Sequence, residues 1–194
     1  MNYKRNFIIF TFCSLFSLVS CGGGSSESNT IATFNQKYFF SLIRCGLGGC
    51  GGYSVDASGE VNFFVLDDFP ATQPTNGLLP ESYLDTIFND RKTFLEMVDG
   101  NVLSENKTLI EEASLGILSN PLNICFDAGE YTYSAYTFDI NSGFYREVII
   151  YKTGDFQSVN PNSAAVVLRD WMIEIAVNNN LASPGDDCTG DYTG

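Results

Sequence analysis

Short runs of aromatic and β-branched residues, separated by turn-forming residues, constrain most strongly what this chain can fold into. Such runs favour β-strands, because their side chains pack well on a pleated surface. Asp56 and Gly59 favour a tight turn between the first two runs, and Ile140-Asn141-Ser142-Gly143 favours a hairpin between the last two. We therefore predict antiparallel hairpins. The four predicted strands cover residues 38–44, 60–66, 130–139 and 144–151.

Apolar residues at three- and four-residue steps predict two longer helices, because this spacing places them on one helical face. One helix is expected over residues 83–98, between a proline and a glycine. The other begins at Ser163, a residue type that commonly caps a helix, and ends at the asparagines 178–180. A shorter helix is expected around residues 108–118.

These elements follow the same order twice, strands first and then a helix, although the two halves do not align as a sequence repeat. The predicted fold class is α+β, an antiparallel sheet with its helices packed on one face. The 44% content of hydrophobic residues is enough for a buried core, so residues 31–194 are expected to form a single globular domain.

The N-terminus has the order of parts found in an export signal. Lys4 and Arg5 precede an uncharged apolar run over residues 7–19, which leads through Ser20 to Cys21. This run is shorter than the roughly 20 apolar residues that a membrane-spanning helix needs. The segment resembles the signal peptide and lipobox of bacterial lipoproteins, and the alternative is an ordinary secretory signal that leaves Cys21 as a thiol.

The resemblance implies that residues 1–20 are a signal peptide and that Cys21 carries a diacylglycerol, which would anchor the chain to a membrane of the bacterial cell envelope. Residues 21–30 would then form a flexible tether, because they offer no apolar side chain to bury after the cysteine. In lipoproteins an aspartate directly after the lipidated cysteine often marks retention at the inner membrane. Gly22 takes that position here, which favours the outer membrane.

The chain is acidic, with 10 basic and 23 acidic residues and a formal net charge of −13. This charge argues against binding to nucleic acid and against electrostatic binding to anionic lipid. The expected partners are the membrane, through the N-terminal lipid, and a protein or glycan bound by the domain. No cofactor is expected, and a solvated acidic surface that keeps the domain soluble explains the charge.

Four cysteines remain if the signal is removed and Cys21 is acylated, an even number in a compartment that permits disulfides. Cys45 and Cys50 bracket a glycine-rich loop, so a bond between them is favoured, and Cys125–Cys188 follows by elimination. The other two pairings stay open. A four-cysteine zinc site is less favoured, because Cys125 and Cys188 do not form a second close pair, and no metal is expected.

The chain contains no histidine, which excludes a histidine general base, a Ser-His-Asp arrangement and a histidine metal ligand. Three short motifs match those of penicillin-recognising enzymes, although their order differs. Motifs this short are expected by chance, so no catalytic residue is assigned. A two-carboxylate glycosidase also stays open, because only geometry would reveal the pair. The three motifs are Ser104 with Lys107, Lys152-Thr153-Gly154 and Ser158-Val159-Asn160.

Tyrosines concentrate on the second predicted hairpin, and tyrosine is favoured in recognition surfaces because it presents rigid, amphipathic area. Tyr131, Tyr133, Tyr136 and Tyr145 are therefore candidate binding residues, with a structural sheet face as the alternative. We expect an exported, lipid-anchored envelope protein whose domain binds a partner without catalysis. The alternative function is an envelope hydrolase that uses carboxylates or a Ser/Lys pair.

Overall fold

The computed structural model describes residues 36–67, 77–124 and 128–181, and within these ranges the chain forms nine strands and three helices. The lipidation candidate Cys21 and the cysteines Cys125 and Cys188 lie outside the described residues. The strands are β1 (Tyr38–Gly46), β2 (Gly49–Asp56), β3 (Glu60–Leu66), β4 (Leu78–Pro80), β5 (Thr93–Met97), β6 (Leu122–Asn123), β7 (Glu130–Asp139), β8 (Phe144–Gly154) and β9 (Phe156–Val159). The helices are α1 (Glu81–Phe88), α2 (Gly100–Ala113) and α3 (Ser163–Asn178).

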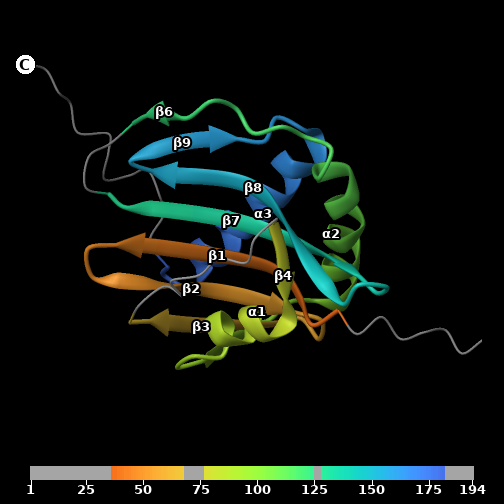
Figure 1. Ribbon diagram of the computed structural model, residues 1–194. Helices are drawn as coiled ribbons and strands as arrows, with labels where there is room; N and C mark the ends of the chain where they lie inside the picture. Colours follow the sequence, from red (N-terminus) through yellow and green to blue (C-terminus); the bar gives the residue numbers. More distant parts are fainter. Residues whose placement is uncertain (1–35, 68–76, 125–127, 182–194) are drawn as a thin grey trace, which may run out of the picture. The chain divides into compact units, whose positions relative to one another are not determined.

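The strands form one antiparallel sheet with the order β5-β3-β2-β1-β7-β8-β9-β6, and β4 pairs with the start of β8 (Figure 1). The first three strands are joined as consecutive hairpins, and β7, β8 and β9 follow one another in the same way. The pairing of β1 with β7 joins these two series, with Leu42 opposite Tyr133. The centre of the sheet is therefore made by strands that are far apart in the sequence.

Helices cover both faces of this sheet. On one face, called here the α2–α3 face, Leu103 of α2 and Leu168 of α3 pack with strand residues such as Phe40 in the larger buried cluster. On the opposite face, called the α1 face, Phe88 of α1 packs with strand residues such as Tyr136. In Figure 1, α1 and β4 lie in front of the sheet and α3 lies behind it.

A register shift in β1 allows this strand to contribute large side chains to both clusters. The pairing of β1 with β2 shifts between Tyr38 and Phe40. Tyr38 consequently packs in the cluster on the α1 face and Phe40 in the cluster on the α2–α3 face. Strand residues two positions apart normally share a face, so the irregularity redirects the side chain at the beginning of the strand.

The fold class predicted from the sequence is wrong in the number of helical layers and in its division into two strand-then-helix units. The described chain is β-rich, built on a single nine-stranded sheet. Its helices lie on both faces instead of one, and the strands do not form two strand-then-helix units, because all nine described strands belong to one sheet. Amphipathic periodicity identifies a helix that packs on a sheet, but it does not say which of the two faces the helix covers.

The predicted helix over residues 83–98 accounts for much of this error. Helix α1 ends at Phe88, and residues 93–97 form the edge strand β5, in which Phe94 is 56% exposed. The next helix begins at Gly100, earlier than expected, because the carboxylate of Asp99 accepts hydrogen bonds from two backbone N–H groups of its first turn. The glycine that was interpreted as a stop is the first residue of α2.

Candidate functional site

A groove with a volume of about 560 Å³ lies on the α1 face. Helix α1 and strand β4 form its wall, and β1, β7 and β8 form its floor. We call it the α1-face groove. Its lining residues are Ile43, Cys45, Gly77, Leu79, Tyr83, Leu84, Ile87, Glu130, Thr132, Tyr136, Glu147, Ile149 and Lys152.

Hydrogen bonds from the start of β1 and from β8 hold α1 over the sheet. Asp85 of α1 accepts from Lys37 Nζ at 2.5 Å and from the Tyr38 hydroxyl at 2.6 Å. Tyr145 of β8 accepts from the Lys37 backbone N–H at 2.7 Å and donates to Glu81 of α1 at 3.3 Å. The wall of the groove is thus tied to the strands that form its floor.

One hydroxyl of the neighbouring strand β7 holds the carboxylate of Glu147 at the floor of the groove. Ser134 Oγ donates to Glu147 Oε1 at 2.6 Å, and next to it the Ser41 and Tyr136 hydroxyls bond to each other at 2.8 Å. Burial raises the pKa of Tyr136, and the negative charge of Glu147 raises it further. The same two causes raise the pKa of Tyr83 on α1. Both phenols therefore stay protonated at neutral pH and can donate hydrogen bonds.

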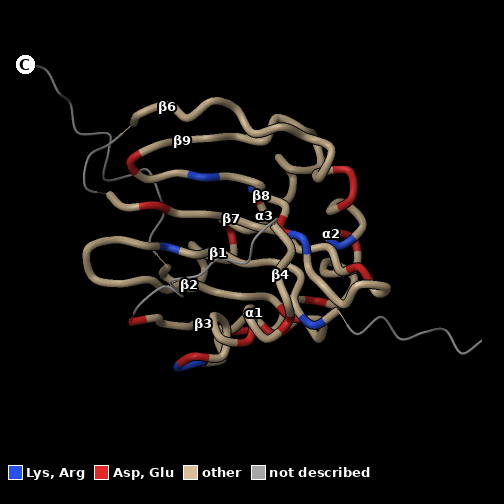
Figure 2. Tube along the Cα trace, in the orientation of Figure 1, with Lys and Arg blue, Asp and Glu red and all other residues tan. Residues whose placement is uncertain are grey.

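Charged side chains are sparse along the strands of the sheet (Figure 2), and the α1-face groove contains three of them. Lys152 Nζ lies 2.7 Å from Glu130 Oε1. Burial alone would raise the pKa of Glu130, but the hydrogen bond from Lys152 and its charge lower it below the usual value. Within the part of the chain that the structure describes, no basic side chain pairs with Glu147. Glu147 therefore carries the uncompensated charge of the groove.

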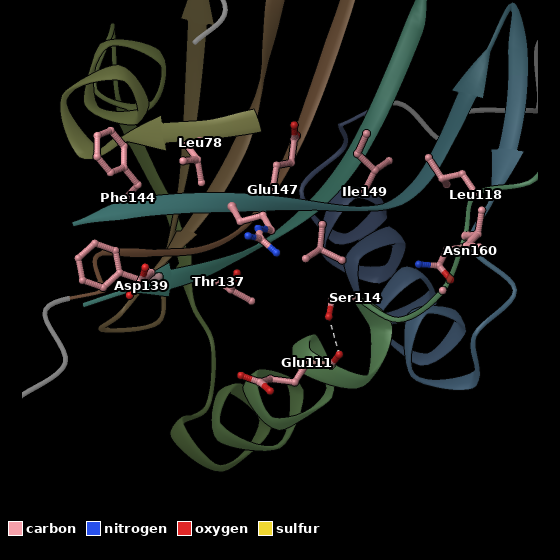
Figure 3. A pocket seen from close by; sticks show the side chains of 15 residues that line it. Leu78, Glu111, Ser114, Leu118, Thr137, Asp139, Phe144, Glu147, Ile149 and Asn160 are labelled. Carbon is pink, nitrogen blue, oxygen red and sulfur yellow. Dashed lines mark hydrogen bonds between the residues drawn. The ribbon is translucent and has the colours of Figure 1, made fainter. Parts of the chain in front are cut away.

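A second cavity, of about 680 Å³, lies between β8 and α2 (Figure 3). Much of its polar lining completes local structure: Asp139 accepts from two groups of its own turn, and Asn160 donates to the carbonyl of Ala113 at the end of α2. The Ser114 hydroxyl donates to the backbone carbonyl of Glu111, a bond drawn as a dashed line in Figure 3. Several polar groups of this larger cavity are therefore already engaged in local structure. Glu147 and Ile149 of β8 line both this cavity and the α1-face groove.

The four candidate tyrosines do not form a recognition surface. Tyr131, Tyr133, Tyr136 and Tyr145 are between 0% and 7% exposed. The first two pack on the α2–α3 face and the other two on the α1 face. Because helices cover both faces, these side chains belong to the core. Of the four, Tyr136 is the one that reaches the lining of the α1-face groove.

Cys45 and Cys50 form a disulfide at the end of the β1–β2 hairpin, with their Cα atoms 4.2 Å apart. This is the pairing that the sequence favours. Leu47 lies at the tip of the hairpin and is fully exposed. Cys45 also lines the α1-face groove, so the disulfide stiffens the strand end that borders the candidate site.

The Ser/Lys motifs are brought together only in part: Lys152 of β8 lies opposite Ser158 of β9, whose side chain is buried, and the first motif lies elsewhere. Ser104 and Lys107 lie on α2, where the Lys107 ammonium sits 3.9 Å from the centre of the Phe39 ring. Lys152 lines the groove on the opposite face of the sheet and pairs with Glu130. Among the described residues, no three potential metal-binding side chains of cysteine, aspartate or glutamate gather in one place.

Sequence reasoning missed Glu147, Ser134 and Tyr83 as site residues. The hairpin between β7 and β8 was predicted with the correct turn, and its register places Tyr136 opposite Glu147. Counting the residue pairs of β7 and β8 from the turn would therefore have placed the hydroxyls of Ser134 and Tyr136 near the carboxylate of Glu147. Tyr83 gave no comparable signal, because its place depends on which face α1 covers.

Comparison of the chain with protein-family models, with curated proteins and with solved structures finds no match. The site is therefore interpreted from its own geometry. None of the helices in the described ranges has the length and apolar character needed to cross a membrane.

Proposed function

We propose that this chain is a lipid-anchored binding protein of the bacterial cell envelope, and that its ligand binds in the α1-face groove without being chemically changed. The groove itself carries the proposal. It has a volume of about 560 Å³, a largely apolar wall, and a few polar groups held in fixed positions by hydrogen bonds. This combination of size, apolar lining and sparse polar groups is typical of small-molecule sites.

The chemistry of the lining supports binding more than catalysis. Glu130 and Lys152 neutralise each other, so neither is poised as a general base or a nucleophile. Ser134, which donates to Glu147, is 1% exposed and lies below the groove. A serine nucleophile must reach its substrate, and this one is covered by its own sheet.

The N-terminal sequence supports the cellular location. Cys21 follows a basic start and an apolar run, and the tether over residues 21–30 is rich in glycine and serine. Such a tether lets an anchored domain stand away from the bilayer. Gly22 in place of aspartate favours the outer membrane over the inner membrane in our proposal.

A matched pair of tryptophan substitutions tests the groove. Thr132 lines it, so Thr132→Trp fills part of its volume, whereas Thr108 is an exposed residue of α2 and Thr108→Trp serves as the control. Small molecules that co-purify with the full chain from envelope extract are identified by mass spectrometry. We expect the wild type and Thr108→Trp to retain the same compound and Thr132→Trp to lose it. Equal retention by all three proteins contradicts binding in the groove.

A further inference from the structure

We infer that the ligand of the α1-face groove is an amphiphilic organic cation, whose positive group pairs with Glu147 and whose apolar stem lies against α1. The inference rests on the proposed function, since it names the chemical class that the same groove selects. Its basis is the juxtaposition of one uncompensated carboxylate with an apolar wall.

The charge of the groove selects the sign of the ligand. Glu130 and Lys152 form a pair, and Glu147 remains as a single negative charge. A ligand anion placed there would meet like charge, whereas a monovalent cation would leave the groove neutral. The net charge of −13 for the whole chain attracts cations to the surface as well.

The carboxylate of Glu147 is oriented before a ligand arrives. Ser134 Oγ holds Oε1 at 2.6 Å, and among the described residues no side chain or backbone group donates to Oε2. One oxygen is thus fixed by the protein while the other can accept from an ammonium group. A group that is already held in place loses little conformational freedom on binding, which favours affinity.

The neighbouring aromatic ring suits a cation better than a neutral polar group. Tyr83 lies on α1 at the groove, close enough for the charge of Glu147 to raise its pKa. An ammonium group beside Glu147 can also contact the electron-rich face of a tyrosine ring, which stabilises cations. Charge and aromatic surface therefore favour the same ligand class.

The rest of the wall accommodates an apolar stem. Leu79 of β4, Leu84 and Ile87 of α1, and Ile43 and Ile149 of the floor line the groove. Burial of each further methylene group on such a surface should tighten binding by about fourfold, so affinity should increase with chain length. An alkylammonium ion combines the two features that the lining offers.

Three probes of equal chain length separate the contributions of charge and apolar surface. Octylammonium, 1-octanol and octanoate are titrated by calorimetry into residues 21–194 carrying Cys21→Ser, which lacks only the proposed signal and lipid. All described elements lie between Gln36 and Leu181, so this protein keeps every one of them. We expect octylammonium to bind more tightly than octanol and octanoate not to bind.

Glu147→Gln should weaken octylammonium binding by about tenfold or more, because a charge-assisted hydrogen bond is lost, and should leave octanol unaffected. Glu111→Gln, on an exposed carboxylate of α2, is the matched control and should change neither. Unchanged octylammonium affinity in Glu147→Gln, or an equal loss in Glu111→Gln, overturns the inference.

Equal binding of octanol and octylammonium, abolished by Thr132→Trp, also overturns the inference but leaves the proposed function standing. If none of the probes binds, the inference fails, while the co-purification experiment still decides the proposed function.

Discussion

Asp85 is the side chain through which α1 is attached to the beginning of β1. It accepts hydrogen bonds from Lys37 and Tyr38, and Asn89 Nδ2 donates to the same oxygen at 3.2 Å. Burial alone would raise the pKa of Asp85, but the hydrogen bonds from Lys37 and Tyr38 lower it below its usual value. A carboxyl group whose pKa is lower in the folded state stabilises that state when it is ionised.

We expect Asp85→Asn to lower the free energy of unfolding at pH 7 by on the order of 1 kcal/mol, because hydrogen bonds to a charged group are lost from a site that solvent partly screens. The contribution of Asp85 is fully present above the pKa of aspartate in the unfolded chain, about 3.9. It is lost as the pH falls below that value and through the lower pKa of the folded state. Denaturant titrations at neutral and strongly acidic pH measure the difference, which should shrink in acid.

Asp67→Asn is the control for this prediction. Asp67 pairs with Arg91 on the surface, where its side chain is 86% exposed, and exposed pairs stabilise proteins little. An equal loss of stability in the two variants would contradict the role assigned to Asp85. A loss for Asp85→Asn that does not change with pH would contradict the electrostatic part of the argument.

For single residues, the sequence predicted the secondary structure correctly but did not predict which side chains are buried. The tyrosines of β7 and β8 were correctly placed on strands, where aromatic residues are favoured. Their burial could not be predicted, because it depends on helices that cover both faces of the sheet. The alternation of apolar and polar residues along one strand does not show whether helices cover the second face. Tyr133 was therefore a candidate binding residue although it is 0% exposed.

Among the structural elements, the β1–β2 hairpin contains one glycine that the strand pairing requires and a nearby glycine that it does not. A Cβ atom on Gly52 would overlap the carbonyl oxygen of Leu42 on the paired strand. At Gly48 a Cβ atom would meet nothing within 4 Å, and the backbone there is not in the left-handed region. The pairing of the strands therefore requires glycine at position 52 but not at position 48.

Alanine substitutions at these two positions should differ sharply. We expect Gly52→Ala to destabilise the domain by about 2–3 kcal/mol or more, because the strands must separate to admit the methyl group. Gly48→Ala should change the free energy of unfolding by no more than about 0.5 kcal/mol. Thermal and denaturant unfolding measure both. Similar values for the two variants would show that the register of β1 and β2 is not as described.

Elements with local signals were predicted well, and elements defined by tertiary contacts were not. The strand over 60–66, the strand over 130–139 and the helix from Ser163 are confirmed with close to the expected bounds. By contrast, β5 was hidden inside an apolar pattern with helical spacing, because an edge strand with exposed apolar residues lacks the alternation that marks a half-buried strand. The two-residue strand β6 carries too little sequence to be recognised at all.

For the molecule as a whole, the decisive contact is the pairing of β1 with β7. It joins residues about 90 positions apart, such as Phe40 and Ala135, and no local pattern specifies which strands meet. The candidate site depends on this contact, since its floor combines Ile43 of β1 with Thr132 of β7 and Glu147 of β8. The groove was therefore beyond sequence reasoning, even though the three strands of its floor were predicted.

The resemblance of the N-terminal segment to a lipobox predicts how the whole molecule is attached to a membrane. We expect Cys21→Ser to move the protein from the membrane fraction to the soluble fraction, because it removes the thiol that would carry the diacylglycerol. A net charge of −13 disfavours electrostatic binding to anionic lipid, and lipid on Cys21 is the anchor that we propose. Cys13→Ser is the matched control, because Cys13 lies in the apolar run and should be removed with the signal. Fractionation and the mass of the N-terminal peptide measure the outcome, and membrane retention of Cys21→Ser at the wild-type level would refute lipid anchoring.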